Sequence, residues 1–100
     1  MIYTDKYKTE LLEQIGRNLT YYRYRCNNAN LLNERGFVSM EKLAEEIDSS
    51  VNMLYNLTAK NVEQGVSLAF IDKLARALDI SLHCFFLKEP IPNPPKYGEE

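Results

Sequence analysis

Residues 38–61 read VSMEKLAEEIDSSVNMLYNLTAKN and contain two short amphipathic segments with a break between them. Ser39 is a suitable N-cap for the first segment, and the run Asp48–Ser50 is typical of a tight turn. The apolar residues of both segments recur at helical spacing, and they are Leu43, Ala44, Ile47, Leu54 and Leu57. The stretch therefore predicts helix, turn and helix, with the motif at about residues 39–59.

Helical spacing continues on both sides of this motif. Upstream, residues 9–26 carry one apolar stripe and predict a long helix, while Leu31 and Leu32 predict an extra turn before a stop at Gly36. Downstream, a helix is expected over residues 67–78, with Leu68 in its apolar stripe, and a last short helix over 81–87. Because no segment alternates as strands do, the predicted fold class is all-α.

The chain is long enough for one hydrophobic core but too short for two. We therefore assign residues 1–89 to one domain. Four prolines within residues 90–95 exclude a helix there, so residues 90–100 are expected to form an extended, proline-rich C-terminal tail. The chain has no apolar run of the roughly 18 residues that span a bilayer, and its N-terminus is polar. These features predict a cytoplasmic protein without a membrane partner.

The sequence lacks the usual patterns of metal-binding and catalytic residues. Cys26 and Cys84 are too few for a disulfide framework, and one histidine, His83, cannot complete a zinc site. The sequence has no phosphate-binding glycine loop and no arrangement typical of a catalytic triad. We expect no metal, no cofactor and no enzymatic activity.

The net charge of −2 is unevenly distributed along the chain. Residues 1–30 hold five basic and three acidic side chains, whereas residues 38–66 hold two basic and five acidic ones. Contacts with phosphates supply most of the non-specific affinity of DNA-binding proteins, so this charge argues against tight non-specific binding. It leaves open a protein that recognises bases through a few well-placed polar groups.

Residues 38–58, together with IGRNLTYYR before them and SLAFIDKLARALDISLHCFF after them, resemble the lambda-repressor/Cro (XRE) family of helix-turn-helix regulators. The resemblance covers residues 15–25 and 38–87. It implies a compact five-helix DNA-binding domain, here with a short helix or loop inserted between the first two helices. It also implies a sequence-specific transcriptional regulator, a repressor, that binds double-stranded DNA as a homodimer.

The second helix of such a motif lies in the major groove, and its first turns contact bases. The outward residues at those positions are Ser50, Val51, Asn52, Tyr55 and Asn56. Asparagine can bind adenine through N6 and N7, and valine can contact the thymine methyl group, so base recognition needs no positive charge. The resemblance places phosphate contacts at Ser39, Lys60 and Asn61. Outside those positions, Arg17 or Arg25 is a further candidate. The alternative is that the asparagines are ordinary solvated residues.

A dimer surface is expected in the apolar C-terminal segment, at Leu82, Phe85 and Phe86, unless these side chains close the monomer's core. Three features depart from the family pattern. Met40 stands where many members have a phosphate-binding glutamine, and Thr58 stands where a glutamate would pair with Arg23. The connection over residues 24–38 is also long. These departures support an alternative function, a helix-turn-helix scaffold that binds a regulatory protein partner, such as an antirepressor or a toxin.

Overall fold

A computed structural model of the chain describes residues 2–58 and 66–99, with side chains from residue 10 onward. Its helices, in chain order, are α1 (Ile2–Tyr22), α2 (Met40–Glu46), α3 (Val51–Thr58) and α4 (Leu68–Leu78). Two 3₁₀ segments accompany them, η1 (Ala29–Leu31) and η2 (Leu82–Phe86). No strand occurs in these two stretches, so the all-α prediction is confirmed, with four α-helices and a 3₁₀ turn in place of the fifth helix.

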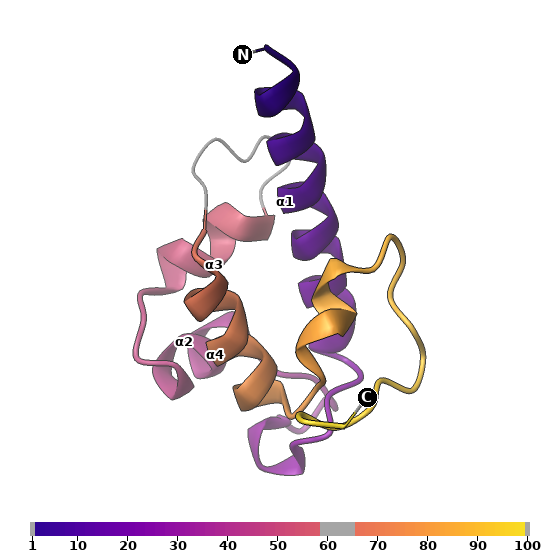
Figure 1. Ribbon diagram of the computed structural model, residues 1–100. Helices are drawn as coiled ribbons and strands as arrows, with labels where there is room; N and C mark the ends of the chain where they lie inside the picture. The colour runs from indigo at the N-terminus through magenta and orange to yellow at the C-terminus, as the bar shows by residue number, and fades with distance from the viewer. Residues whose placement is uncertain (1, 59–65, 100) are drawn as a thin grey trace.

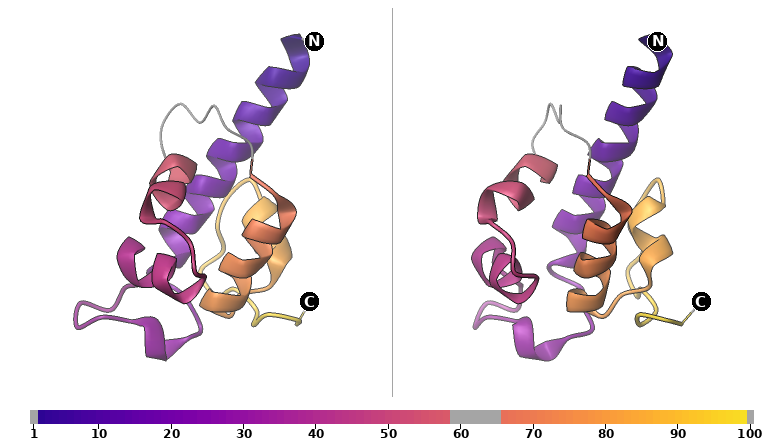
Figure 2. Two further views of the ribbon diagram at one scale, coloured as in Figure 1. Left: turned by 90° about the vertical axis from the view of Figure 1, so that its left-hand side faces the viewer. Right: turned by 60° about the vertical axis from the view of Figure 1, so that its left-hand side comes forward.

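The long helix α1 packs against α3 on one side and η2 on the other, while its N-terminal half projects beyond the rest of the domain (Figure 1). Helices α2 and α3 lie on the opposite side of the core from η2, and α4 lies between these two helices and η2 (Figure 2). The buried core is formed by one side of every helix and includes Leu12, Ile15, Leu19, Leu43, Leu54, Leu57, Ile71, Leu74, Leu78 and Phe85.

The predicted helix limits hold best where the capping groups are local. Ser39 caps α2 by accepting a hydrogen bond from the Lys42 N–H, and Ser67 caps α4 by accepting one from the Phe70 N–H. Leu68, expected in the apolar stripe of α4, is instead 63% exposed, because it is the first residue of the helix. The predicted extra turn lies at η1, and the stop at Gly36 is a turn with a φ of 86°.

The end of α1 differs from the prediction, which extended the helix to residue 26. The Arg23 carbonyl accepts a hydrogen bond from the Val38 N–H at 2.9 Å, and the Arg23 Nε donates to the Val38 carbonyl at 2.7 Å. This reciprocal pair joins the end of α1 to the residue before the cap of α2. The chain leaves the helix at Tyr22 because Val38, a distant residue, takes the next carbonyl.

The proline-rich tail, residues 90–99, packs on the helices of the domain. Pro94 is buried, the carbonyl of Pro95 accepts from the Ser81 N–H at 2.9 Å, and the Ile91 N–H donates to the Tyr22 hydroxyl at 3.2 Å. The Tyr97 hydroxyl also donates to the Asp72 carboxylate on α4 at 2.5 Å. Residues 90–99 therefore belong structurally to the same unit as the helices.

Candidate nucleic-acid interface

The turn between α2 and α3 is held by backbone hydrogen bonds. Asp48 takes a left-handed conformation with a φ of 55°, and the Ser49 N–H then donates to the Ala44 carbonyl at 2.9 Å. The Ser50 hydroxyl accepts from the Met53 N–H at 3.3 Å, so Ser50 caps α3. The left-handed conformation at Asp48 is uncommon for residues other than glycine, and aspartate is one of the few that adopt it.

The position of α3 depends on a glycine in α1 that the sequence analysis did not single out. A Cβ atom at Gly16 would lie 2.3 Å from the Leu57 carbonyl oxygen and 3.2 Å from the Thr58 Cα. Only glycine allows the two helix backbones to approach so closely. A glycine inside an amphipathic helix lowers helix propensity, and this penalty is the sequence signal that could have indicated a packing role.

The outer face of α3 carries the predicted base-contacting residues. Ser50, Asn52 and Asn56 are exposed, and Tyr55 is 49% exposed, whereas Val51 is partly buried. The opposite face is anchored by Leu54 and Leu57, which are 0% and 1% exposed. The polar side chains of α3 therefore face solvent, while its apolar face packs against the core and fixes the helix in place.

One further contact links this face to α2. The Tyr55 hydroxyl donates to a carboxylate oxygen of Glu41 at 3.3 Å. The first turn of α2 and the outer face of α3 therefore share one surface of the domain. On the α2 side this surface carries the carboxylate of Glu41, and Glu45 and Glu46 are also exposed further along α2.

Only some of the predicted phosphate contacts lie among the residues that the structure describes. Lys60 and Asn61 lie outside the described residues. Ser39 is partly buried, and its hydroxyl is occupied as the cap of α2, accepting from the Lys42 N–H at 3.1 Å. Arg17 is exposed and donates to the Lys88 carbonyl at 2.8 Å, which places it on the opposite side of α1 from α3.

The two single-residue departures from the family pattern both have structural roles. Met40, the first residue of α2, is 4% exposed and belongs to the core, so an apolar contact replaces the polar side chain. Thr58 has no charge to pair with Arg23, and its hydroxyl donates to the carbonyls of Leu54 at 3.4 Å and Tyr55 at 3.2 Å within α3. The Arg23 guanidinium bonds to Val38 and lies 5.7 Å from the centre of the Phe37 ring.

The predicted dimer residues are placed in and around η2. Phe85 is fully buried and packs edge-to-face on Tyr22 with ring centres 5.4 Å apart. It closes the monomer's core, so the expectation that it lies on a dimer surface does not fit the structure. Leu82 is partly buried and Phe86 is 36% exposed, and these two remain at the surface.

A second buried residue that the sequence analysis missed fixes the same segment. Asn18 is fully buried in α1, and its Nδ2 donates to the carbonyls of Phe85 at 2.9 Å and Leu87 at 2.8 Å. Its Oδ1 has no hydrogen-bond partner among the residues that the structure describes. An asparagine on the apolar stripe of a helix is the feature that identifies such a position.

The described part of the chain contains two cysteines as its reactive groups. Cys26 and Cys84 are free, and burial raises the pKa of both thiols, so both are held in the neutral form. Within residues 10–58 and 66–99, no three His, Cys, Asp or Glu side chains are grouped as metal ligands are. No described helix combines the length and apolar character required to span a membrane.

Two short helices joined by a tight turn, with the second presenting polar side chains outward, define a helix-turn-helix domain. Residues 29–83 match the family model of the Cro/C1-type HTH DNA-binding domain. Because this match covers more than half of the chain, the protein belongs to that DNA-binding family. No significant match is found among curated proteins or among solved structures.

Proposed function

We propose that this protein is a sequence-specific transcriptional regulator, a repressor, that recognises the major groove with α3 and binds DNA as a homodimer. The observation that carries the proposal is the pair of exposed asparagines, Asn52 and Asn56, on a helix whose other face is fully buried. One helical turn apart, they can contact neighbouring base pairs, and adenine offers the matching acceptor and donor.

Dimerisation follows from the small number of bases that one helix of this length can contact. Each well-paired base contributes about 1–3 kcal/mol of discrimination, so a few contacts give modest specificity and two half-sites are needed. Leu82 and Phe86 are the surface residues that support this part of the proposal. We expect the half-sites to lie about 10 base pairs apart or a multiple of that, as for other dimeric helix-turn-helix proteins.

The experiment is selection of bound duplexes from a random DNA pool, combined with measurement of the mass of the complex. The proposal predicts an inverted repeat containing A·T pairs and a complex of two chains on one duplex. Phe86→Ser is expected to weaken binding to the full repeat while leaving the melting temperature close to that of the unmodified protein. Enrichment of a single, non-repeated site would remove the homodimer from the proposal.

A protein-interaction module is the second candidate, and the exposed acidic side chains of α2 favour it. Glu41 accepts a hydrogen bond from the Tyr55 hydroxyl of α3, and Glu45 and Glu46 are exposed further along α2. Such a face suits a basic protein surface better than phosphates. Failure of the selection to enrich any duplex, with the protein folded and intact, would favour this candidate over DNA recognition.

A further inference from the structure

The helix-turn-helix motif itself has little positive charge with which to hold DNA. Residues 38–58 contain one basic side chain, Lys42, against four acidic ones, and the Lys42 ammonium lies 3.7 Å from a Glu45 carboxylate oxygen. Protein–DNA affinity depends strongly on contacts between basic side chains and phosphates. If α3 binds DNA as proposed above, other parts of the chain must supply these contacts.

The insertion loop, residues 24–38, is the segment that leads directly into the first turn of α2. Together with Arg23 it holds three arginines against one acidic residue, Glu34. Its last residue, Val38, is bonded in both directions to Arg23 and precedes the cap residue of α2. Since Tyr55 contacts the first turn of α2, the base of the loop borders the same surface as the outer face of α3.

The far end of the loop has a defined conformation. The Asn33 side-chain oxygen accepts from the Arg35 N–H at 2.9 Å and from the Phe37 N–H at 3.3 Å, and the Asn33 N–H donates to the Phe37 carbonyl at 2.9 Å. Gly36 closes the turn with a positive φ of 86°. The backbone that carries Arg35 is therefore fixed, and less entropy is lost when its side chain binds.

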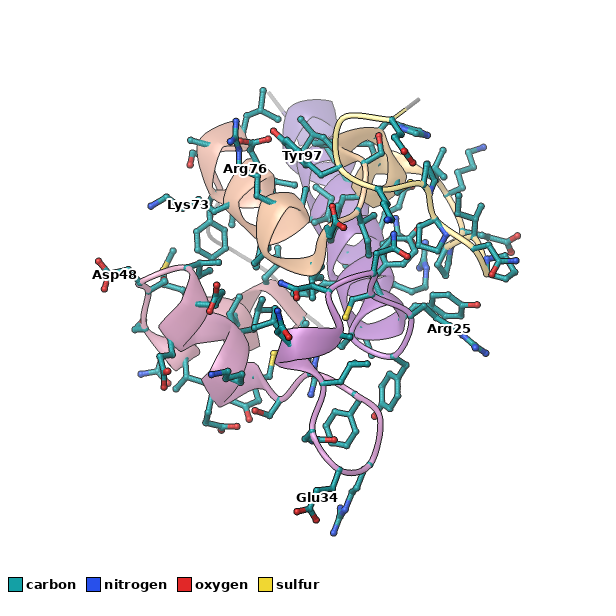
Figure 3. The ribbon with its side chains drawn as sticks, turned by 90° about the horizontal axis from the view of Figure 1, so that it is seen from below. Arg25, Glu34, Asp48, Lys73, Arg76 and Tyr97 are labelled. Carbon is teal, nitrogen blue, oxygen red and sulfur yellow. The ribbon has the colours of Figure 1, made fainter. Side chains whose placement is uncertain are left out.

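Aromatic rings support the loop from its base. Tyr24 and Phe37 stack with ring centres 5.1 Å apart and an interplanar angle of 29°. Tyr24 is 54% exposed, and Arg35 is exposed without an ion-pair partner among the described residues. Figure 3 shows Glu34 at the far end of the loop, well away from the body of the domain, whereas Arg25 extends from a different side.

We propose that the insertion loop is a second DNA-binding element, in which Arg35 contacts a phosphate of the duplex flanking the half-site. The proposal rests on the DNA-binding function inferred above. A guanidinium suits this contact because its N–H groups can bond two phosphate oxygens at once. The neighbouring Glu34 opposes the same phosphates, so the loop makes a limited contribution to affinity and none to base discrimination.

The experiment compares two duplexes that carry the site selected from the random pool. The long duplex extends about one helical turn beyond each end of the site, and the trimmed duplex ends at the site itself. Releasing counterions from one phosphate contributes about 0.9 of a decade in affinity at 0.1 M salt, or roughly eightfold. We expect Arg35→Gln to weaken binding to the long duplex by about that factor and to leave binding to the trimmed duplex unchanged.

Matched variants separate the loop contact from general electrostatics. Lys96→Gln removes one positive charge from the exposed surface of the tail, outside the insertion loop and the helix-turn-helix, and is expected to bind both duplexes as the unmodified protein does. Glu34→Gln is expected to strengthen binding to the long duplex. The salt dependence of Arg35→Gln on the long duplex should be shallower by about one ion, with melting temperatures confirming that all variants are folded.

The possible failures are distinguishable. If the unmodified protein binds both duplexes equally, or if Arg35→Gln and Lys96→Gln weaken binding to the same extent, the loop contact is wrong while DNA recognition by α3 stands. If the folded protein binds neither duplex and enriches no sequence, both the loop contact and the proposed function are wrong.

Discussion

Replacing Gly16 with alanine tests whether the close approach of α1 and α3 positions the DNA-binding helix. The added Cβ would meet the Leu57 carbonyl oxygen at 2.3 Å, where about 3.5 Å is the optimal separation of non-bonded atoms. The opposing atoms belong to the backbone of α3, so no side-chain rotation can relieve the overlap. The two helices must separate locally by about 1 Å.

Two opposing terms set the expected change in stability. Alanine is favoured over glycine inside a helix by about 1 kcal/mol, whereas overpacking a core contact typically destabilises a protein by about 1–3 kcal/mol. Because the overlap at Gly16 is with backbone atoms, we expect a net destabilisation of about 1–2 kcal/mol. For a domain of this size that lowers the melting temperature by roughly 5–15 °C, and the domain stays folded at room temperature.

Gly16→Ala is also expected to reduce the affinity of α3 for its specific DNA site. Hydrogen bonds to bases weaken steeply when the donor and acceptor move apart by about 1 Å, whereas non-specific contacts with phosphates tolerate such a shift. Gly16→Ala should therefore lower affinity for the selected site more than affinity for unrelated duplex DNA. Thr20→Ala, an exposed substitution one turn further along α1, is the control for a gain in helix propensity, and it also removes the hydrogen bond from the Thr20 hydroxyl to the Gly16 carbonyl at 3.0 Å.

Thermal unfolding and a titration with the two duplexes provide the assay. A Gly16→Ala variant as stable as Thr20→Ala, with an unchanged ratio of specific to non-specific affinity, would refute the reasoning. It would mean that the α1–α3 contact adapts without moving the groups on the outer face of α3.

Two further predictions concern how the tail is attached to the domain. Tyr22→Phe removes the hydroxyl that donates to the Cys84 carbonyl and accepts from the Ile91 N–H, and urea unfolding should show a loss of about 1–3 kcal/mol. A loss within experimental error would show that these groups find other partners. The hydrogen bond from Tyr97 lowers the pKa of the Asp72 carboxyl and raises the pKa of the Tyr97 hydroxyl. The stabilisation from the Asp72 carboxyl is fully present above its ordinary pKa of about 4, and it is lost as the pH falls through the lowered pKa. The stabilisation from the Tyr97 hydroxyl is present below its ordinary pKa of about 10, and it is lost as the pH rises through the raised pKa. The difference in melting temperature between the unmodified protein and Tyr97→Phe should therefore be largest between roughly pH 5 and 9, and a difference independent of pH would contradict this.

The features that local sequence determines were predicted correctly. The α2–turn–α3 motif, the cap at Ser39 and the helix α4 all depend on residues a few positions apart. Side-chain caps and helical periodicity act within one or two turns, so a single sequence is enough to find them. The exposure of Asn52 and Asn56 follows from the same periodicity.

The features that were missed depend on residues far apart in the chain. Helix α1 ends at Tyr22 because Val38 bonds to Arg23, and the tail folds back because Tyr22 and Asn27 offer hydrogen bonds to residues 91 and 94. The role of Gly16 requires knowledge of which backbone lies opposite it. No pattern within either segment reveals such a partner, because each pairing exists only after folding.

The same limit explains the error at η2. An apolar run near the end of a chain fits a core and a dimer surface equally well, and the sequence alone does not show which side chains face inward. The structure separates them, since Phe85 is fully buried beneath Tyr22 while Phe86 stays at the surface.

The most direct test of DNA recognition by α3 pairs a protein change with a change of one base atom. Duplexes carrying the selected site are prepared with adenine or 7-deazaadenine, which lacks the N7 acceptor, at each A·T pair in turn. We predict one position at which 7-deazaadenine weakens binding by the unmodified protein, by an amount within the range of about 1–3 kcal/mol for a bidentate pair. At that position the replacement should leave binding by either Asn52→Ala or Asn56→Ala unchanged. Equal losses for the unmodified protein and both variants at every position would contradict this prediction.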